Sequence, residues 1–136
     1  MTNHLVYLSL GTNLGDREGN LRKAVMLIGE RVGTVIRQSS LIETEPWGFQ
    51  SVNRFLNAAI LCESTLSPRQ LLKATQRIER DMGRTNKSGA EGYADRVIDI
   101  DILLYDDIKV DEPDLKIPHP LMYERDFVMI PLKEIL

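Results

Sequence analysis

The stretch that decides the fold reads Val97-Ile98-Asp99-Ile100-Asp101-Ile102-Leu103-Leu104-Tyr105. Apolar and acidic residues alternate along it, and a period of two is typical of a β-strand with two unlike faces. The expected core face carries Ile98, Ile100, Ile102 and Leu104, and the opposite face carries Asp99, Asp101 and Leu103. The stretch therefore predicts a strand that packs on a core through one face and holds two carboxylates on the other.

Outward from this strand, alternating segments at 5–10, 35–44 and 54–63 predict three further strands. Apolar residues at helical spacing predict a helix after Asp16, and the capping box at 67–70 starts a second helix that ends at Gly83. The order strand, helix, strand, strand, helix, strand is the ferredoxin-like βαββαβ pattern. We expect an α+β fold, an antiparallel sheet with two helices on one face.

The segments between these elements have the composition of loops. Residues 11–16 predict a turn, and the polar stretches 45–53 and 84–95 predict two long loops. Four prolines after residue 110 favour an irregular C-terminal extension. A length of 136 residues fits a single domain over 1–136.

Composition excludes several classes of protein. The formal net charge of −3 argues against a nucleic-acid partner. No apolar stretch reaches the roughly 20 residues that cross a bilayer, and the N-terminal residues lack the pattern of a signal peptide. Cys62 is the only cysteine and is expected to be an inert core residue. We therefore expect a cytoplasmic protein without nucleic-acid or membrane partners.

The two acids of the first stretch are the sharpest chemical signal. Strand periodicity places Asp99 and Asp101 on the same side, with roughly 7 Å between them along the strand. Two carboxylates on a buried strand repel each other unless a cation neutralises them, and Mg²⁺ often takes one or two carboxylates together with substrate phosphates. The alternative is a solvated sheet face with two incidental acids.

Basic residues accompany these acids. Arg84, Lys87 and Arg96 lie in or beside the second loop, and Arg125 lies further along. Phosphoryl transfer needs positive groups around the charge that develops on the phosphate oxygens. The chain contains no G-x-x-x-x-G-K-[ST] motif, so an ordinary solvated loop remains the alternative.

Other side chains suit a flat heterocycle. Phe55 and Asn57 share one strand face, where a ring offers a stacking surface and an amide offers a donor and an acceptor. Trp47 and Phe127 could add apolar walls, although Phe55 could equally be a core residue. Three further candidates are left open between ligand contact and structural or surface roles: Gln76, Glu79 and His119.

Several blocks of the sequence together resemble one known family. They are Leu8–Asp16, Phe55–Ala59, Gln76–Arg84, Asp95–Leu104, Ile117–Pro120 and Glu124–Val128, in this order. This set is similar to 6-hydroxymethyl-7,8-dihydropterin pyrophosphokinase, an enzyme of folate biosynthesis. The resemblance runs from Val6 to about Leu132. Asn86, Tyr93 and Pro120 depart from some family members.

The resemblance implies a reaction and a set of site residues. ATP would give its pyrophosphoryl group to the pterin alcohol, leaving the pterin diphosphate and AMP, with two Mg²⁺ ions held by Asp99 and Asp101. The implied catalytic residues are Arg84, Arg96, Asp99 and Asp101. The implied ATP contacts are Gln76, Glu79, Arg84, Lys87, Tyr93, Arg96, Ile102, His119 and Arg125. The implied pterin contacts are Thr44, Trp47, Phe55, Asn57, Asp99 and Phe127. A monomer is expected, with weak association with other folate-pathway enzymes as a possibility.

Two other functions remain open. A different Mg²⁺-dependent nucleotide enzyme on a related fold would keep the acids and the cations, but it has no need for Phe55, Asn57 and Phe127. A non-catalytic ferredoxin-like ligand-binding domain would not need an acid pair that faces a basic loop. The products formed from ATP, and their dependence on Mg²⁺, separate these readings.

Overall fold

The structure is a computed structural model, and it describes residues 3–44, 54–83 and 97–136. Its strands are β1 His4–Thr12, β2 Gly33–Gln38, β3 Ile42–Thr44, β4 Phe55–Ser64, β5 Asp99–Tyr105, β6 Val110–Glu112 and β7 Leu115–Ile117. Its helices are α1 Arg17–Arg31, α2 Pro68–Asp81, the short 3₁₀ helix η1 Met122–Glu124 and α3 Asp126–Ile135.

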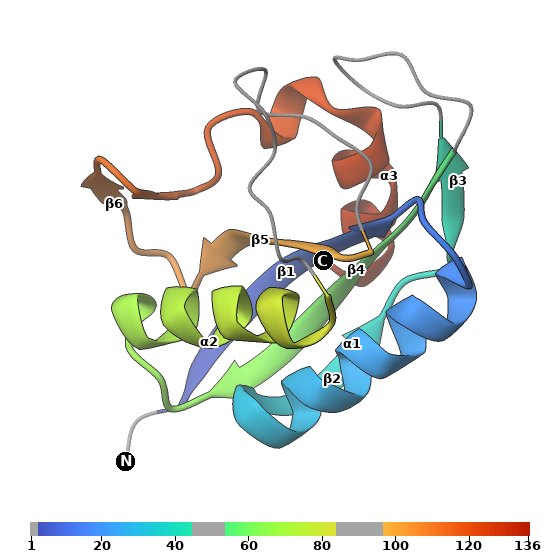
Figure 1. The fold of residues 1–136 in the computed structure, drawn as a ribbon. Helices are drawn as coiled ribbons and strands as arrows, with labels where there is room; N and C mark the ends of the chain where they lie inside the picture. Colours follow the sequence, from blue (N-terminus) through green and yellow to red (C-terminus); the bar gives the residue numbers. More distant parts are fainter. Residues whose placement is uncertain (1–2, 45–53, 84–96) are drawn as a thin grey trace.

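The main sheet has the order β2-β4-β1-β5, with β3 paired to β4 beyond the end of β2 (Figure 1). All of its described pairs are antiparallel. β6 and β7 form a separate hairpin. The longer strands and the first two helices follow the βαββαβ order, so the predicted ferredoxin-like fold is confirmed. β5 lies at the edge of this sheet.

Local sequence chemistry explains where the first two helices begin. The Asp16 carboxylate accepts the Gly19 N–H at 3.1 Å, and Ser67 and Gln70 form the predicted capping box. Both helices lie on one side of the sheet (Figure 1). They bury a large apolar cluster there, in which Cys62 is fully enclosed and its pKa is raised by burial to about 12. The predicted core role of Cys62 is confirmed.

The tail is more regular than its prolines predict. Residues 126–135 form α3, which lies on the other side of the sheet (Figure 1) and packs against Ala59, Leu61 and Leu103. The expectation of a mostly irregular tail is therefore wrong. The face opposite α1 and α2, expected to be open, is covered here. Pro131 weighs against a helix, but Val128, Leu132 and Ile135 recur at helical spacing and are all buried.

Two strand predictions needed correction near the middle and the start of the chain. The single strand expected over 35–44 is two strands, because Ser39 leaves the ladder and exchanges hydrogen bonds with the backbone of Ala59 at 2.8 and 2.9 Å. Gly11 and Thr12 belong to β1 rather than to the expected turn, since each pairs with β4. Gly11 therefore lies within the sheet.

A bulge changes which faces the end of β5 presents. Tyr7 pairs with Leu104, whereas Leu8 pairs with Ile102, so Leu103 is an extra residue on β5. The shift turns Leu104 toward the α3 side and Tyr105 toward the α1 and α2 side. The expected face was correct for Ile98, Ile100 and Ile102 but wrong for Leu104.

No helix in the described ranges combines the length and the apolar character that crossing a bilayer requires.

Candidate active site

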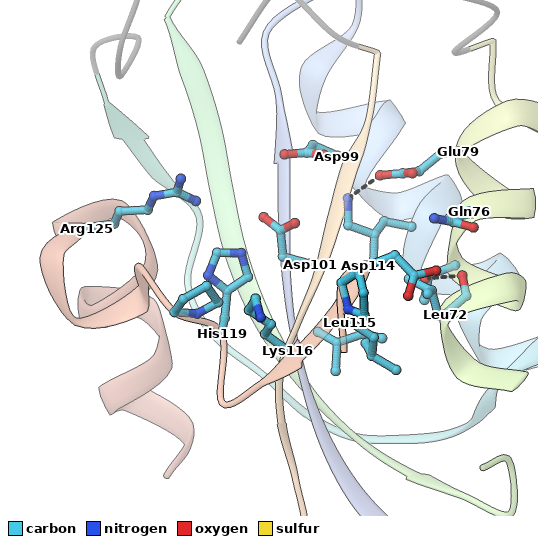
Figure 2. Close-up of a pocket in the computed structure, with 15 residues that line it drawn as sticks. Leu72, Gln76, Glu79, Asp99, Asp101, Asp114, Leu115, Lys116, His119 and Arg125 are labelled. Carbon is cyan, nitrogen blue, oxygen red and sulfur yellow. Dashed lines mark hydrogen bonds between the residues drawn. The ribbon is translucent and has the colours of Figure 1, made fainter. Parts of the chain in front are cut away.

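A cleft of about 550 Å³ extends around the outer edge of β5. α2 forms one wall, the β6–β7 hairpin closes one end, and the segment that leads to α3 forms the other wall (Figure 2). It is lined by Leu72, Thr75, Gln76, Glu79, Asp99, Ile100, Asp101, Ile102, Pro113, Asp114, Leu115, Lys116, His119, Pro120 and Arg125. The cleft thus collects residues from four parts of the chain.

Asp99 and Asp101 line this cleft from β5, and both are partly buried. Figure 2 shows both carboxylates on the side of the strand that faces His119 and Arg125. Ile100, between them, packs into the opposite core. The alternation read from the sequence therefore brings the two acids together on one side of an edge strand.

Glu79 supports the same strand from the other side. Its side chain is only 6% exposed, and its Oε2 accepts the Ile100 N–H at 2.8 Å (Figure 2). Of the roles left open for Glu79, the surface role is therefore excluded. That N–H belongs to the residue between Asp99 and Asp101, so the Glu79 carboxylate fixes the backbone that carries both. Gln76, one turn earlier on α2, is exposed and lines the cleft.

This contact predicts a stability effect. Glu79→Ala leaves the Ile100 N–H without its acceptor and should lower the free energy of unfolding by about 1–3 kcal/mol. Glu79→Gln keeps an amide oxygen at the same reach and should lower it less. Urea unfolding of the two variants beside the parent measures both. Equal stability of the parent and Glu79→Ala would contradict the assigned role.

His119 and Arg125 form the wall opposite α2. The backbone N–H of His119 donates to the Leu103 carbonyl at 3.1 Å. The ring atom Nδ1 of His119 accepts the backbone N–H of Leu121 at 3.3 Å. Burial lowers the pKa of His119, nearby Arg125 lowers it further, and Asp99 opposes them. The lowered pKa favours the neutral imidazole, and because Nδ1 accepts the Leu121 N–H, the ring proton lies on Nε2. Arg125 is 6% exposed.

A second group of predicted residues surrounds Asn57, which is 2% exposed. Its Nδ2 donates to Thr44 Oγ1 at 2.8 Å and to the Ile42 carbonyl at 3.4 Å. A carbonyl only accepts, so this contact fixes which end of the amide is nitrogen. Phe55 lies at the start of β4, paired with Thr44 and partly buried.

Strand register connects the two groups. Gly11 of β1 pairs with Asn57 on one side and with Asp99 on the other. Asn57, Gly11 and Asp99 therefore form a row across three adjacent strands. Arg125 links the groups a second time, since its guanidinium carbon lies 5.6 Å from the centre of the Phe127 ring. Phe127 itself is partly buried and packs on the α3 cluster.

Not every expected residue is described. Trp47, Arg84, Lys87, Tyr93 and Arg96 lie outside the described residues, as does Asn86. The expected residues that the structure does describe divide into a cleft group and an Asn57 group. The Asn57 group is Thr44, Phe55, Asn57 and Phe127. The cleft group is Gln76, Glu79, Asp99, Asp101, Ile102, His119 and Arg125.

The β6–β7 hairpin was not predicted from the sequence. Asp114, Leu115 and Lys116 line the cleft from it, together with Leu72 and Thr75 of α2. Arg69, near the start of α2, pairs with Glu112 and, at 2.7 Å, with Asp114, which ties the hairpin to the helix. The sequence feature that could have indicated this part of the site is Lys116, a basic residue among the prolines of the tail.

The carboxylate pair is compatible with Mg²⁺. This ion prefers oxygen ligands and often takes one or two carboxylates plus substrate phosphates, and Asp99 and Asp101 offer oxygens to a cleft with room for a nucleotide. In the described ranges no cluster of three or more His, Cys, Asp or Glu side chains is placed to hold a metal.

An acid pair on an edge strand, with a buried arginine and a neutral histidine across the cleft, suits an enzyme that transfers phosphoryl groups. The comparison with known families is more specific. Residues 7–136 match the family described as 7,8-dihydro-6-hydroxymethylpterin-pyrophosphokinase (HPPK), and the chain belongs to this family. The family and the enzyme class that the sequence blocks implied are confirmed.

Individual relatives agree with this assignment. A Porphyromonas gingivalis protein named 2-amino-4-hydroxy-6-hydroxymethyldihydropteridine pyrophosphokinase is 51% identical over 132 residues, which cover 96% of this chain and 90% of that protein. A Bacillus subtilis protein of the same name is 42% identical over 134 residues, covering 98% and 78%. The Pisum sativum "Folate synthesis bifunctional protein, mitochondrial" is 42% identical over 131 residues, covering 96% of this chain and 25% of that protein.

Solved structures share the fold at low identity. The Plasmodium falciparum HPPK-DHPS wild type with SDX-DHP superposes with a TM-score of 0.74 at 15% identity, over 95% of this chain and 40% of that one. An HPPK-DHPS in complex with substrates gives a TM-score of 0.75 at 14% identity, over 98% of this chain. This chain spans about 40% of each of those chains.

Proposed function

We propose that the cleft around β5 is the active site of this pyrophosphokinase. Here the 6-hydroxymethyl oxygen of 6-hydroxymethyl-7,8-dihydropterin attacks the β-phosphorus of ATP. The bond from that phosphorus to the α–β bridging oxygen breaks, and the products are the pterin diphosphate and AMP, in the route to tetrahydrofolate. The observation that supports the proposal is the row Asn57, Gly11 and Asp99, which puts a buried amide and an acid of the cleft at the same level of the sheet, with only β1 between them.

Asp99 and Asp101 are the proposed ligands of two Mg²⁺ ions that arrive with ATP. When bound, Mg²⁺ neutralises the charge that develops on the phosphate oxygens and holds the reacting groups in line. The protein contributes the fixed direction of the two carboxylates. β1 on one side and the Glu79 contact on the other hold the strand that carries them.

The nucleotide is proposed to lie along the cleft. Gln76, Glu79 and Ile102 would contact it from one side, and His119 and Arg125 from the other. Arg125 supplies a permanent positive charge, whereas the neutral imidazole of His119 supplies an N–H donor. Lys116, from the β6–β7 hairpin, joins this group. The proposal also includes four residues outside the described ranges: Arg84, Lys87, Tyr93 and Arg96. Arg84 and Arg96 have the catalytic role of neutralising charge.

The pterin is proposed to bind on the Asn57 side. Both hydrogen bonds that the Asn57 amide makes with described residues use Nδ2, so Oδ1 is the atom proposed to accept an N–H from a pterin edge. Phe55 and Phe127 supply the aromatic surfaces. Thr44 holds the amide, and Trp47 completes the pocket in the proposal. Arg125 contacts the Phe127 ring, which brings the phosphate side and the pterin side together.

The wider setting is part of the same proposal. We place the protein in the cytoplasm as a monomer and a single domain over 1–136, with weak association with other folate-pathway enzymes. Support comes from relatives in which a similar segment forms a quarter of a bifunctional protein.

An omission series tests the function. The protein is incubated with ATP, Mg²⁺ and 6-hydroxymethyl-7,8-dihydropterin, and AMP is measured with each component left out in turn. AMP should appear only in the complete mixture. AMP release without the pterin would favour another nucleotide enzyme, and ATP binding that ignores Mg²⁺ would favour a non-catalytic ligand-binding domain.

A further inference from the structure

Gly11 occupies the middle of the row that joins the two parts of the site. It is buried in β1, between Asn57 of β4 and Asp99 of β5. The row includes neither Ser9, which lies two residues earlier in β1, nor the residues that follow Thr12. A side chain at this position would meet the Asn57 amide, so the size of residue 11 bears on the site.

The space beside Gly11 is already taken. A Cβ built on Gly11 would lie 3.0 Å from Asn57 Oδ1 and 3.6 Å from Cδ1 of the Phe55 ring. The first distance is short enough that the amide oxygen would have to move by a few tenths of an ångström. Both contacts are with side chains proposed to read the pterin, and Oδ1 is the proposed acceptor atom.

The Asn57 amide has little freedom to accommodate such a contact. Its Nδ2 is bonded to Thr44 Oγ1 at 2.8 Å and contacts the Ile42 carbonyl at 3.4 Å. Moving Oδ1 away from Gly11 rotates or shifts the whole planar amide. The displacement therefore either weakens these bonds or turns the acceptor away from its direction.

We propose that Gly11 is a positioning residue for the pterin. The missing side chain leaves the volume in which the Asn57 amide oxygen and the edge of the Phe55 ring lie, and so sets the direction in which Asn57 accepts a hydrogen bond from the heterocycle. This inference rests on the proposed function, since it refines how the same site recognises its acceptor substrate.

Gly11→Ala tests the proposal through a split between kinetic constants. The KM for the pterin should rise about threefold to tenfold, the cost of one weakened hydrogen bond. The kcat and the KM for ATP should stay within about twofold of the parent values, since the cleft residues are untouched. A fall in kcat with an unchanged pterin KM would overturn the proposal, because it would indicate action through Asp99.

Gly29→Ala is the matched control. It makes the same chemical change on an exposed turn of α1, where an added Cβ meets nothing within 4 Å. The kcat and the KM values for the pterin and for ATP should equal those of the parent, and a helical Ala in place of Gly should raise stability slightly. A similar rise in pterin KM in both variants would overturn the specific role of Gly11.

A double-mutant cycle isolates the route of the effect. In an Asn57→Ala background the amide is gone, so adding Gly11→Ala should not raise the pterin KM further. The double variant also removes the close contact, so this comparison holds even if Gly11→Ala alone folds poorly. Additive rises would overturn the proposal. A parent protein that forms no AMP in the complete mixture would instead count against the proposed function.

Discussion

Replacing Asp99 or Asp101 with alanine is expected to abolish nearly all turnover, by roughly a thousandfold or more, while the protein still folds. Each change removes a carboxylate that is proposed to hold Mg²⁺ against the phosphates. Both side chains are only partly buried, and neither belongs to an apolar cluster. The measurement is the rate of AMP formation in the complete mixture, beside circular dichroism and urea unfolding of each variant.

Asp107→Ala is the matched control for this prediction. Asp107 is an exposed acid just beyond β5 and does not line the cleft. Its variant should turn over at the parent rate, which excludes a general effect of lost negative charge. Near-normal turnover in Asp99→Ala or Asp101→Ala would contradict the metal role assigned to that residue.

The second large effect concerns the helix that covers the far face of the sheet. Leu132→Ala should lower the free energy of unfolding by about 2–5 kcal/mol, the range for emptying a fully buried leucine site. Leu132 is 0% exposed, in the cluster with Ala59, Leu61 and Leu103. Urea unfolding measures the loss, and the change in the midpoint should come with little change in slope.

Ile130→Ala is its control on the same helix. Ile130 is 50% exposed, so truncating it should cost well under about 1 kcal/mol. A loss of similar size for the two variants would indicate that α3 does not pack on the sheet as described. The comparison therefore tests the packing of the element for which the sequence prediction was wrong.

The correct predictions came from short-range chemistry. Ser67 and Gln70 mark a helix start because they satisfy backbone groups within a single turn. Asp99 and Asp101 share a side because strand periodicity depends only on the local backbone. Neither inference needed information about distant residues, and both are confirmed in the fold.

The wrong predictions all depended on distant partners. The α3 helix forms despite Pro131 because its apolar stripe finds a face of the sheet to cover. The bulge at Leu103 is defined by its pairing with β1, and Glu79 is buried because Ile100, far along the chain, presents its N–H. Gly11 looked like a turn residue, because its sequence neighbours carry no sign that Asn57 and Asp99 flank it.

Phosphorus NMR of the completed reaction is the most direct test of the proposed function. With ATP, Mg²⁺ and 6-hydroxymethyl-7,8-dihydropterin, the proposed function predicts AMP and the pterin diphosphate in equal amounts, without free pyrophosphate. The same mixture with Asp101→Asn, which keeps the shape but removes the charge, should show ATP unchanged over the same time. Formation of ADP or of free pyrophosphate by the parent protein, or full conversion by Asp101→Asn, would contradict it.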